Sequence, residues 1–392
     1  MIDFELTEEQ KGLQQRAKNF IDEEIRPHEK AWPEFIEDWD KNLRAQVLKK
    51  AEEAGVMKLS FPKEYGGQGL SHLSEAIVKI ELRKASGPIG GLLTIQGDPF
   101  PAMYEGTEYQ KEKYLWPVLR YEKDFAFAFT EPVAGSDFKG IQTTAVKKGD
   151  NWVLNGRKVF CSGAHHADFT FVCAYTDESK GSRGMNMFYV DKETPGWEVE
   201  RLLPMFVGGS RYEPIMKLEN CVVPAENMVG GEKGFAVGMG QFNRARVSIA
   251  EGAVAKAERS LELAIDYAKK RYAFGRPIGQ FGEIQRMITN SKIGVDTMRW
   301  LLYHTAWKWD RGESIRLDAA MTKVYCVETG LRVIDDCMQV FGGIGLTSDY
   351  PMGDYYRELR QNRSAEGTLE IMRYIMARDL LGDEVARMPS VA

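Results

Sequence analysis

The sequence predicts an α+β fold of several domains: a helical domain at the amino terminus (1–122), a middle β-domain (123–233) and a carboxy-terminal helix bundle (234–392). Two observations predict this order. Apolar residues recur at helical spacing up to about residue 120 and again after residue 234, while short runs typical of strands fill the region between. A chain of 392 residues is also about two and a half times as long as a typical domain, which favours several packed units.

Helices separated by irregular segments are expected in the amino-terminal region. Thr7 and Gln10 have the spacing of a capping box, and the pattern that follows predicts a helix over 8–20. Helical patterns recur at 74–84 and 108–119. Between them, 61–69 and 87–101 contain glycine and proline, which interrupt helices.

Short apolar and aromatic runs mark the middle region. They lie at 125–129, 152–160, 169–175 and 186–190 and predict strands. Gly149-Asp150 and Asn155-Gly156 are turn signals between such runs, and Asn-Gly in particular favours a tight hairpin.

Beyond residue 234 the strand signals end and long helical patterns take their place. Apolar residues recur at helical spacing beside a charged face; they are Val254, Ala257, Leu261, Ala264 and Ala268. Further periodic segments at 281–311 and 316–341 predict a helix bundle packed against the middle region.

Composition and charge exclude several classes of protein. Hydrophobic residues at 43% and charged residues at 28% favour a packed core, and a net charge of −5 gives no reason to bind nucleic acid. Five cysteines without a CxxC pair or a cysteine–histidine cluster indicate neither a disulfide framework nor a metal site. The longest uncharged stretch, 85–97, is too short to span a membrane. The acidic start lacks the features of a secretion signal, so we expect a cytoplasmic protein.

The common signatures of nucleotide and nucleophile sites are absent: no Walker loop, GxSxG or HExxH occurs, and the glycines at 342–345 follow a helical pattern rather than a strand. TEPVAGSD at 130–137 follows a predicted strand. Its small residues would let backbone N–H groups approach an anionic or aromatic ligand, although an ordinary polar turn fits it equally well. In NGRKVFCSG at 155–163, Phe160 and Ser162 share a strand face, so a ring and a hydroxyl could meet one flat ligand.

Four later segments complete a pattern with these two: RYAFGRPIGQF (271–281), QVFGGIG (339–345), YPMGDYYRELR (350–360) and AEGTLEI (365–371). In this order and with these separations, they resemble the acyl-CoA dehydrogenase family of flavoproteins, over nearly the whole chain. The resemblance implies an N-terminal helical domain, a middle β-barrel-like domain and a C-terminal four-helix bundle. It also implies FAD as cofactor, an acyl-CoA substrate, and an electron-transfer flavoprotein or similar carrier as partner.

The resemblance implies specific cofactor contacts. Those expected within one chain are made by Phe127, Phe129, Thr130, Ser136, Phe160, Ser162 and Thr368, with Ser162 beside flavin N5. Contacts to the FAD of a neighbouring subunit are expected from Arg271, Phe274, Gln339 and Gly343. An oligomer, a homotetramer or a dimer, is therefore expected.

Glu366 matches the family base, which removes the α-proton while the β-hydrogen passes as hydride to flavin N5. Because an ordinary glutamate has a pKa of about 4.3, the site must desolvate Glu366 and raise its pKa. Its backbone N–H and a ribityl hydroxyl of FAD would form the oxyanion site. The alternative is a glutamate that only favours a helix N-terminus. A minority of members carry the base at the position of Ala245, which cannot accept a proton here.

Substrate contacts are implied for Ser136, Arg246, Gly367 and Asp98, with Arg246 holding the CoA moiety. Asp98 is the one ionisable residue in 87–101, the segment that lines the acyl pocket in the family. Asp98 would bind a polar or cyclic acyl group or act as a second base. The alternative is that it only ends a helix and faces solvent. Arg363 would meet a distal carboxylate, or be solvated at a helix end.

The expected reaction is α,β-dehydrogenation of an acyl-CoA to the 2,3-enoyl-CoA. Three alternatives stay open: an oxygen-using oxidase on the same fold, a reductase that uses the same residues, and a non-catalytic flavin- or CoA-binding assembly protein. Chain length, branching and ring character of the acyl group are not set by one sequence, because several helices together shape such a pocket.

Overall fold

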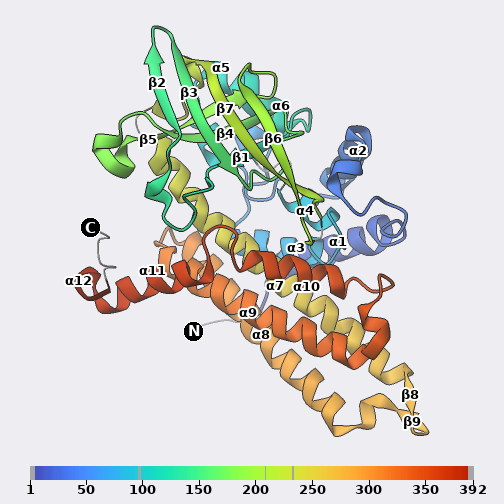
Figure 1. The fold of residues 1–392 in the computed structure, drawn as a ribbon. Helices are drawn as coiled ribbons and strands as arrows, with labels where there is room; N and C mark the ends of the chain where they lie inside the picture. Colours follow the sequence, from blue (N-terminus) through green and yellow to red (C-terminus); the bar gives the residue numbers. More distant parts are fainter. Residues whose placement is uncertain (1–4, 96–98, 208, 232–233, 387–392) are drawn as a thin grey trace.

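The computed structural model describes residues 5–95, 99–207, 209–231 and 234–386. Figure 1 shows helices, then a curled β-sheet, then a bundle of long helices, in chain order. This arrangement confirms the fold class that the periodicity predicts. None of the described helices is both long and apolar enough to cross a membrane.

The amino-terminal part consists of short helices: α1 (Glu8–Phe20), α2 (Lys41–Glu53), α3 (His72–Leu82), α4 (Ile89–Ile95), α5 (Glu108–Gln110) and α6 (Trp116–Leu119). The predicted capping box at the start of α1 is confirmed, since the Gln10 N–H donates to Thr7 Oγ1 at 3.2 Å and the Thr7 N–H donates to Gln10 Oε1 at 3.0 Å. A π-helical turn, Lys111–Leu115, joins α5 to α6, so the predicted helix at 108–119 is continuous but of mixed type.

The middle part is a seven-stranded sheet. Its strands are β1 (Phe125–Ala128), β2 (Thr144–Lys148), β3 (Asn151–Val159), β4 (Phe169–Tyr175), β5 (Met185–Asp191), β6 (Trp197–Pro204) and β7 (Tyr212–Pro224). They run in the order β1-β4-β2-β3-β7-β6, with β5 antiparallel to β4. β1 pairs with β4 in parallel, and a separate backbone hydrogen bond from the Val159 N–H to Thr130 O joins the chain that follows β1 to the end of β3.

Asn155-Gly156 is not a hairpin turn, and that prediction is wrong. Both residues lie within β3, where the pairing with β7 shifts between Leu154 and Gly156 in a β-bulge. A Cβ atom at Gly156 would lie 2.3 Å from Thr143 Oγ1, so glycine is required there by close approach rather than by a turn. The other signal, Gly149-Asp150, does connect β2 to β3.

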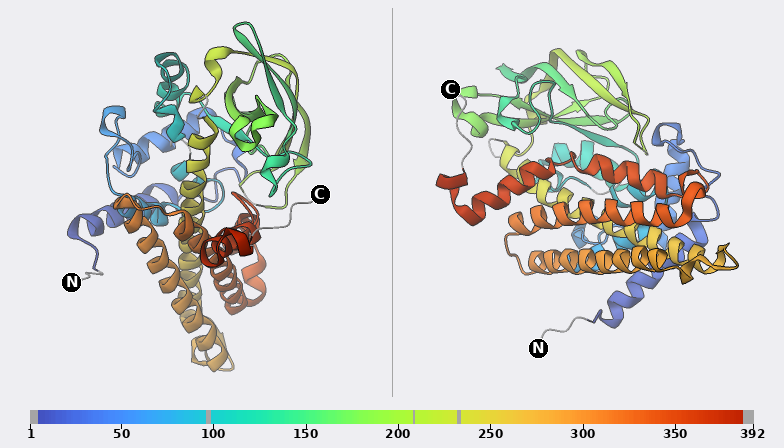
Figure 2. Two further views of the ribbon diagram at one scale, coloured as in Figure 1. Left: turned by 90° about the vertical axis from the view of Figure 1, so that its left-hand side faces the viewer. Right: turned by 60° about the horizontal axis from the view of Figure 1, so that its bottom comes forward.

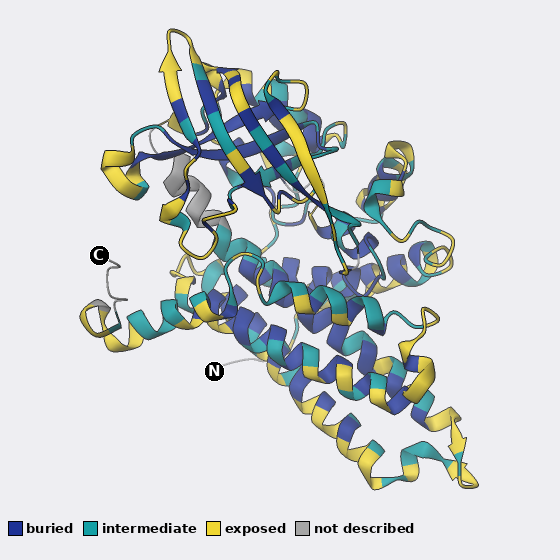
Figure 3. Cartoon of the chain, viewed as in Figure 1, coloured by how far each residue is buried: buried dark blue, intermediate teal, exposed yellow. Residues whose placement is uncertain are grey.

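The carboxy-terminal part is built from α7 (Gly234–Lys270), α8 (Gly282–Asp310), α9 (Arg316–Phe341), α10 (Met352–Asn362), α11 (Leu369–Leu381) and α12 (Asp383–Ala386). The apolar positions predicted to face the core of α7 are all buried: Val254, Ala257, Leu261, Ala264 and Ala268. Figure 3 shows the buried stripes of α7, α8 and α9 facing one another. Strand signals do not end entirely at residue 234, because β8 (Tyr272–Ala273) and β9 (Arg276–Pro277) form a small hairpin after α7.

Helix α7 connects the two ends of the molecule. It is 37 residues long and runs from beside the sheet through the bundle to the β8–β9 hairpin, as the views in Figures 1 and 2 agree. Side chains along one helix therefore reach both the sheet and the far tip of the bundle.

Candidate active site

Glu366 lies in the turn between α10 and α11. The helix begins only at Leu369, because Thr368 is its N-cap and Thr368 Oγ1 accepts a hydrogen bond from the Ile371 N–H at 3.2 Å. Glu366 precedes this cap, so it is not a first-turn residue that stabilises the helix start. Its φ is +53°, a conformation that is uncommon outside glycine and is retained mainly at functional sites.

Two basic side chains hold the backbone of this turn through three successive carbonyl oxygens. Lys323 Nζ, on α9, donates hydrogen bonds to Ala365 O and Gly367 O. Arg246 Nε, on α7, donates to Glu366 O at 3.4 Å. Both basic residues are buried. The turn is thereby fixed to two helices of the bundle.

The Glu366 carboxylate itself makes no comparable contact. Across the described ranges, no side chain forms an ion pair with it or donates a hydrogen bond to it, and the residue is exposed. The water-poor surroundings that we expected are therefore not supplied by the chain alone. Protein atoms still lie close enough to desolvate the carboxyl and raise the pKa of Glu366, although the positive charges of Lys323 and Arg246 act in the opposite direction. The carboxylate is recessed but open to water.

Gly367 completes the turn with a φ of +90°. A Cβ atom there would lie 2.9 Å from Met372 Cε and 3.8 Å from Arg246 Nη2. Glycine therefore allows both the backbone conformation and the close packing of the turn against α7 and α11.

A second group of predicted residues gathers where β1 and β3 end. The Val159 N–H donates to Thr130 O at 2.9 Å, which joins the segment after β1 to the segment after β3. Beyond this bond, Phe160 is 57% exposed with a φ of +56°, and Ser136 and Ser162 are exposed as well. An exposed aromatic ring and two exposed serines thus occupy neighbouring segments, and Ser162 Oγ donates a hydrogen bond to Glu213 Oε1 at 2.7 Å.

A buried ion pair anchors these segments. Lys158 Nζ lies 2.7 Å from Glu131 Oε1 and also donates to Phe129 O at 3.1 Å. Glu131 Oε1 further accepts hydrogen bonds from the N–H and the hydroxyl of Thr143. Burial alone would raise the pKa of Glu131, but the charge and hydrogen bond of Lys158 and the Thr143 bonds leave it lowered.

Aromatic residues at the end of β1 and directly after it connect this region to α7. Phe127 and Phe129 are half-buried, and their rings stack with centroids 5.5 Å apart. The ring of Phe129 also lies 5.7 Å from that of Phe242, which is one helical turn before Arg246 on α7. Because Arg246 reaches the Glu366 turn, the sheet residues and the Glu366 turn meet along the same part of α7.

The remaining predicted cofactor residues lie elsewhere. Arg271 and Phe274 belong to the β8–β9 hairpin, and Phe274 is 95% exposed. Gln339 and Gly343 follow at the end of α9, near the hairpin, since the rings of Tyr267 and Phe341 stack 4.2 Å apart. Figure 1 places this tip at the opposite end of α7 from the sheet. One chain therefore does not bring these four residues to Glu366 or Ser162.

Asp98 lies outside the described residues, so its role rests on the sequence alone. Arg363 is the C-cap of α10, and its guanidinium lies 3.7 Å from Glu328 Oε1 on α9. It is therefore engaged in an ion pair rather than solvated alone.

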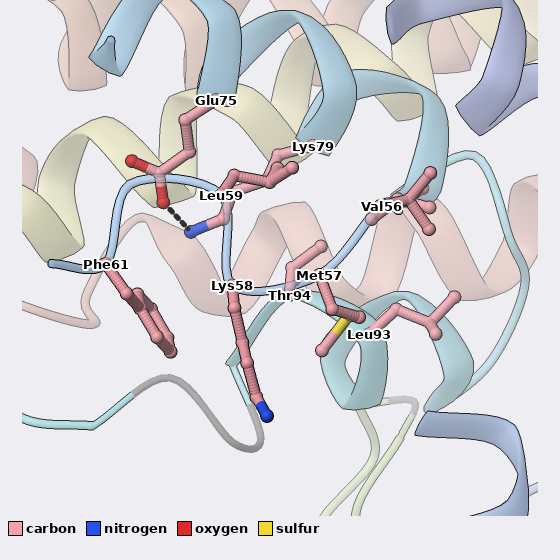
Figure 4. A pocket seen from close by; sticks show the side chains of 10 residues that line it. Val56, Met57, Lys58, Leu59, Phe61, Glu75, Lys79, Leu93 and Thr94 are labelled. Carbon is pink, nitrogen blue, oxygen red and sulfur yellow. Dashed lines mark ion pairs between the residues drawn. The ribbon is translucent and has the colours of Figure 1, made fainter. Parts of the chain in front are cut away.

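The cavity drawn in Figure 4 is lined by none of the site residues described above, although its lining includes Leu93 and Thr94 of the segment 87–101, which is expected to line an acyl pocket. It lies between α3, α4 and the segment 56–61, and the Glu75–Lys79 ion pair, at 2.7 Å, closes one side of it. Its volume of about 20 Å³ has room for one water molecule and not for an acyl chain.

Family models match all three parts of the chain: the acyl-CoA dehydrogenase N-terminal domain at 7–122, the middle domain at 126–213 and the C-terminal domain at 232–381. The chain belongs to the acyl-CoA dehydrogenase family. A 3-(aryl)acrylate reductase of Clostridium sporogenes is 35% identical over 385 residues, covering 96% of this chain and 99% of that protein.

Solved structures of the family have the same fold. Butyryl-CoA dehydrogenase from Megasphaera elsdenii superposes with a TM-score of 0.87 at 31% identity, covering 97% of this chain and 100% of that one. A chain solved in work on the electron transferring flavoprotein of Acidaminococcus fermentans gives the same TM-score and coverage at 35% identity.

The acyl-CoA dehydrogenase family depends on FAD, and solved structures of this fold include an FAD complex. The residues of this chain fit a flavin. An exposed ring, Phe160, and the exposed hydroxyls of Ser136 and Ser162 lie on two segments that the Val159–Thr130 bond holds together. They would contact a flat heteroaromatic group, which needs stacking and hydrogen bonds on one surface.

Sequence reasoning missed Lys323, Lys158, Glu131 and Glu213. For Lys323 a signal was present, because Ala319, Ala320 and Val327 on the same helical stripe are all apolar and buried. A lysine on such a stripe has to find buried partners. Which carbonyls it binds depends on a turn 42 residues later, and no local pattern reveals that.

Proposed function

We propose that this chain is an FAD-dependent acyl-CoA dehydrogenase that converts an acyl-CoA to its 2,3-enoyl-CoA. The observation that carries the proposal is the Glu366 turn, in which a glutamate with a raised pKa and no partner of its own is fixed by Lys323 and Arg246. A carboxyl whose pKa is raised by nearby protein atoms and which has no partner of its own among the described residues is suited to remove a proton from carbon.

In this proposal Glu366 removes the proton from the carbon next to the thioester. FAD, when bound, accepts the β-hydrogen and its electron pair. The developing negative charge on the thioester oxygen is stabilised by the Glu366 N–H. Arg246 holds the turn and contributes positive charge near the CoA moiety. Ser136 and Ser162 hydrogen-bond the cofactor and substrate, and Phe160 stacks on the ring system.

The location of the β8–β9 hairpin supports an oligomer. Arg271, Phe274, Gln339 and Gly343 lie at the end of the bundle away from Ser162, so they contact FAD only if a second subunit presents that end. We infer a homotetramer in which these residues complete a neighbour's cofactor site. The electrons then pass to an electron-transfer flavoprotein. Such a carrier is the subject of the work on Acidaminococcus fermentans in which the similar chain was solved.

A reductase is the second candidate, and a specific observation favours it. The relative from Clostridium sporogenes is named a 3-(aryl)acrylate reductase and is similar over almost its whole length. In that direction Glu366 would return a proton to the α-carbon of an unsaturated substrate. The same side chains serve both directions, because a catalyst lowers one barrier for both.

Anaerobic spectroscopy of the purified flavoprotein tests both candidates. A panel of straight, branched, cyclic and aryl-substituted acyl-CoA esters should include one that bleaches the flavin. If only unsaturated compounds react, by reoxidising the flavin after chemical reduction, the enzyme works as a reductase. Absence of either change with every compound would favour a binding protein without catalysis.

A further inference from the structure

Lys323 is a fully buried lysine whose ammonium group binds the Glu366 turn. Burying an ammonium group is costly unless hydrogen bonds compensate it. Burial lowers the pKa of Lys323 to about 8; Glu366 and Glu370 raise it, and Arg246 lowers it further. An apolar side chain could fill the same space, so packing alone does not call for an ammonium group here.

The first of its two bonds fixes the direction of the Glu366 N–H. Ala365 O and the Glu366 N–H belong to the same peptide unit, and in a planar trans peptide they point in opposite directions. Because Lys323 draws Ala365 O toward α9, the Glu366 N–H points away from α9. Within the described part of the chain, this N–H has no hydrogen-bond acceptor.

Arg246 fixes the other side of Glu366, because Glu366 O belongs to the peptide unit that follows the Glu366 Cα, and the second Lys323 bond holds the next unit along the chain. Lys323 also binds Gly367 O, and Arg246 binds the carbonyl between them. The peptide units before and after the Glu366 Cα are thereby both held, with φ at +53° between them. This conformation determines where the side chain leaves the backbone, so the carboxylate and the N–H are oriented together.

We propose that Lys323 is a positioning residue of the acyl-CoA reaction, which aims the Glu366 N–H at the thioester oxygen and the Glu366 carboxylate at the α-carbon by binding Ala365 O and Gly367 O. The inference rests on the proposed function of Glu366. A residue needed only for folding would satisfy the two carbonyl oxygens without affecting the acidity of a bound substrate.

The test uses a CoA thioester with sulfur in place of the β-carbon. This analogue can lose its α-proton but cannot pass on a hydride, and its enolate gives a long-wavelength charge-transfer band with oxidised flavin. We expect the wild type to form the band and Lys323→Met to retain FAD and bind the analogue but form little of it. With a true substrate, kcat should fall about 10²-fold, as expected for a misplaced catalytic group, while KM changes little.

Lys256→Met is the matched control. Lys256 is also buried, 4% exposed, but it pairs with Glu358 at 2.9 Å and does not touch the Glu366 turn. Like Lys323→Met, the Lys256→Met variant removes one buried positive charge. It should lower the stability of the protein but still form the charge-transfer band. Equal band intensity and equal kcat in Lys323→Met and the wild type would overturn the inference. A wild type that holds FAD but forms no band with any analogue contradicts the proposed function instead.

Lys323→Arg decides the matter if Lys323→Met does not fold. The charged groups that act on Lys323 are Glu366 and Glu370, which raise its pKa, and Arg246, which lowers it. Loss of the Lys323 proton above pH about 8 should weaken its hydrogen bonds to Ala365 O and Gly367 O and therefore lower kcat in the wild type. Arginine stays protonated in this pH range, so kcat of Lys323→Arg should not fall above pH about 8. The same decline in both proteins would rule out Lys323 as its source and contradict the inference.

Discussion

Ser162 Oγ donates a hydrogen bond to Glu213 Oε1 at 2.7 Å, while among the described residues the other oxygen of Glu213 is buried without a partner. A hydroxyl group has one proton, so Ser162 cannot donate to an ionised Glu213 and to a flavin nitrogen at once. In the proposed cofactor site, the protonation state of Glu213 would therefore determine whether the Ser162 hydroxyl can donate to the flavin.

Replacing Glu213 should change how stability depends on pH. Burial raises the pKa of Glu213; the Ser162 bond lowers it, and the nearby Glu37 raises it further. A carboxyl whose pKa is raised on folding contributes stability below its unfolded pKa and loses it as pH rises through the folded value. Glu213→Gln should therefore raise Tm relative to the wild type at pH 8, with the difference vanishing near pH 4. A constant difference between pH 4 and 8, by calorimetry, would contradict this assignment.

Breaking the buried Lys158–Glu131 pair should be severe. Lys158→Met leaves the Glu131 carboxylate buried beside Thr143 without its cation, which typically costs about 3–5 kcal/mol. Denaturant unfolding of the apoprotein measures this, and FAD content should fall as well. The double variant Glu131→Gln/Lys158→Met should recover part of the loss. Lys217→Met, which removes an exposed partner of Glu219, should leave the midpoint nearly unchanged.

Gly367→Ala should damage catalysis more than stability alone explains. The φ of +90° costs about 1–3 kcal/mol for a residue with a side chain, and the new Cβ would press on Met372 and displace the Glu366 turn. We expect kcat to fall at least about tenfold, since small displacements of catalytic groups have large effects.

Gly382→Ala distinguishes the effect of backbone strain at a positive φ from the effect of displacing the Glu366 turn. Gly382 has a φ of +82° at the other end of α11, and an added Cβ there would meet no atom of the described residues within 4 Å. It should cost a similar amount of stability and leave kcat unchanged. If both variants reduced kcat equally, displacement of the Glu366 turn would not be the cause.

The order of helices and strands was predictable because it follows from local periodicity. The buried residues of α7 recur at helical spacing, and the Thr7 capping box involves neighbours in sequence. Asn155-Gly156 was misassigned because its role depends on a contact between segments that are distant in sequence. Its glycine is required by Thr143 on a neighbouring strand, a contact that no local pattern contains.

The sequence proposes the residue types of the candidate site but not the side chains that support them. The sequence pointed to Glu366, Phe160 and Ser162 through the family resemblance. Lys323 binds a turn from another helix and Glu213 reaches Ser162 from another strand, so both contacts exist only after the fold brings distant segments together. The exposure of Glu366 was likewise not foreseen, because the chain leaves that carboxylate uncovered.

Anaerobic flavin reduction by an acyl-CoA, compared between the wild type and Glu366→Gln, tests the central claim most directly. Glutamine has nearly the same shape but cannot take the α-proton, so both proteins should bind FAD and thioester alike. The wild type should bleach rapidly, at a rate that falls at low pH as Glu366 becomes protonated, and the variant should be slower by about 10²- to 10⁴-fold. Bleaching of Glu366→Gln at the wild-type rate would show that Glu366 is not the base.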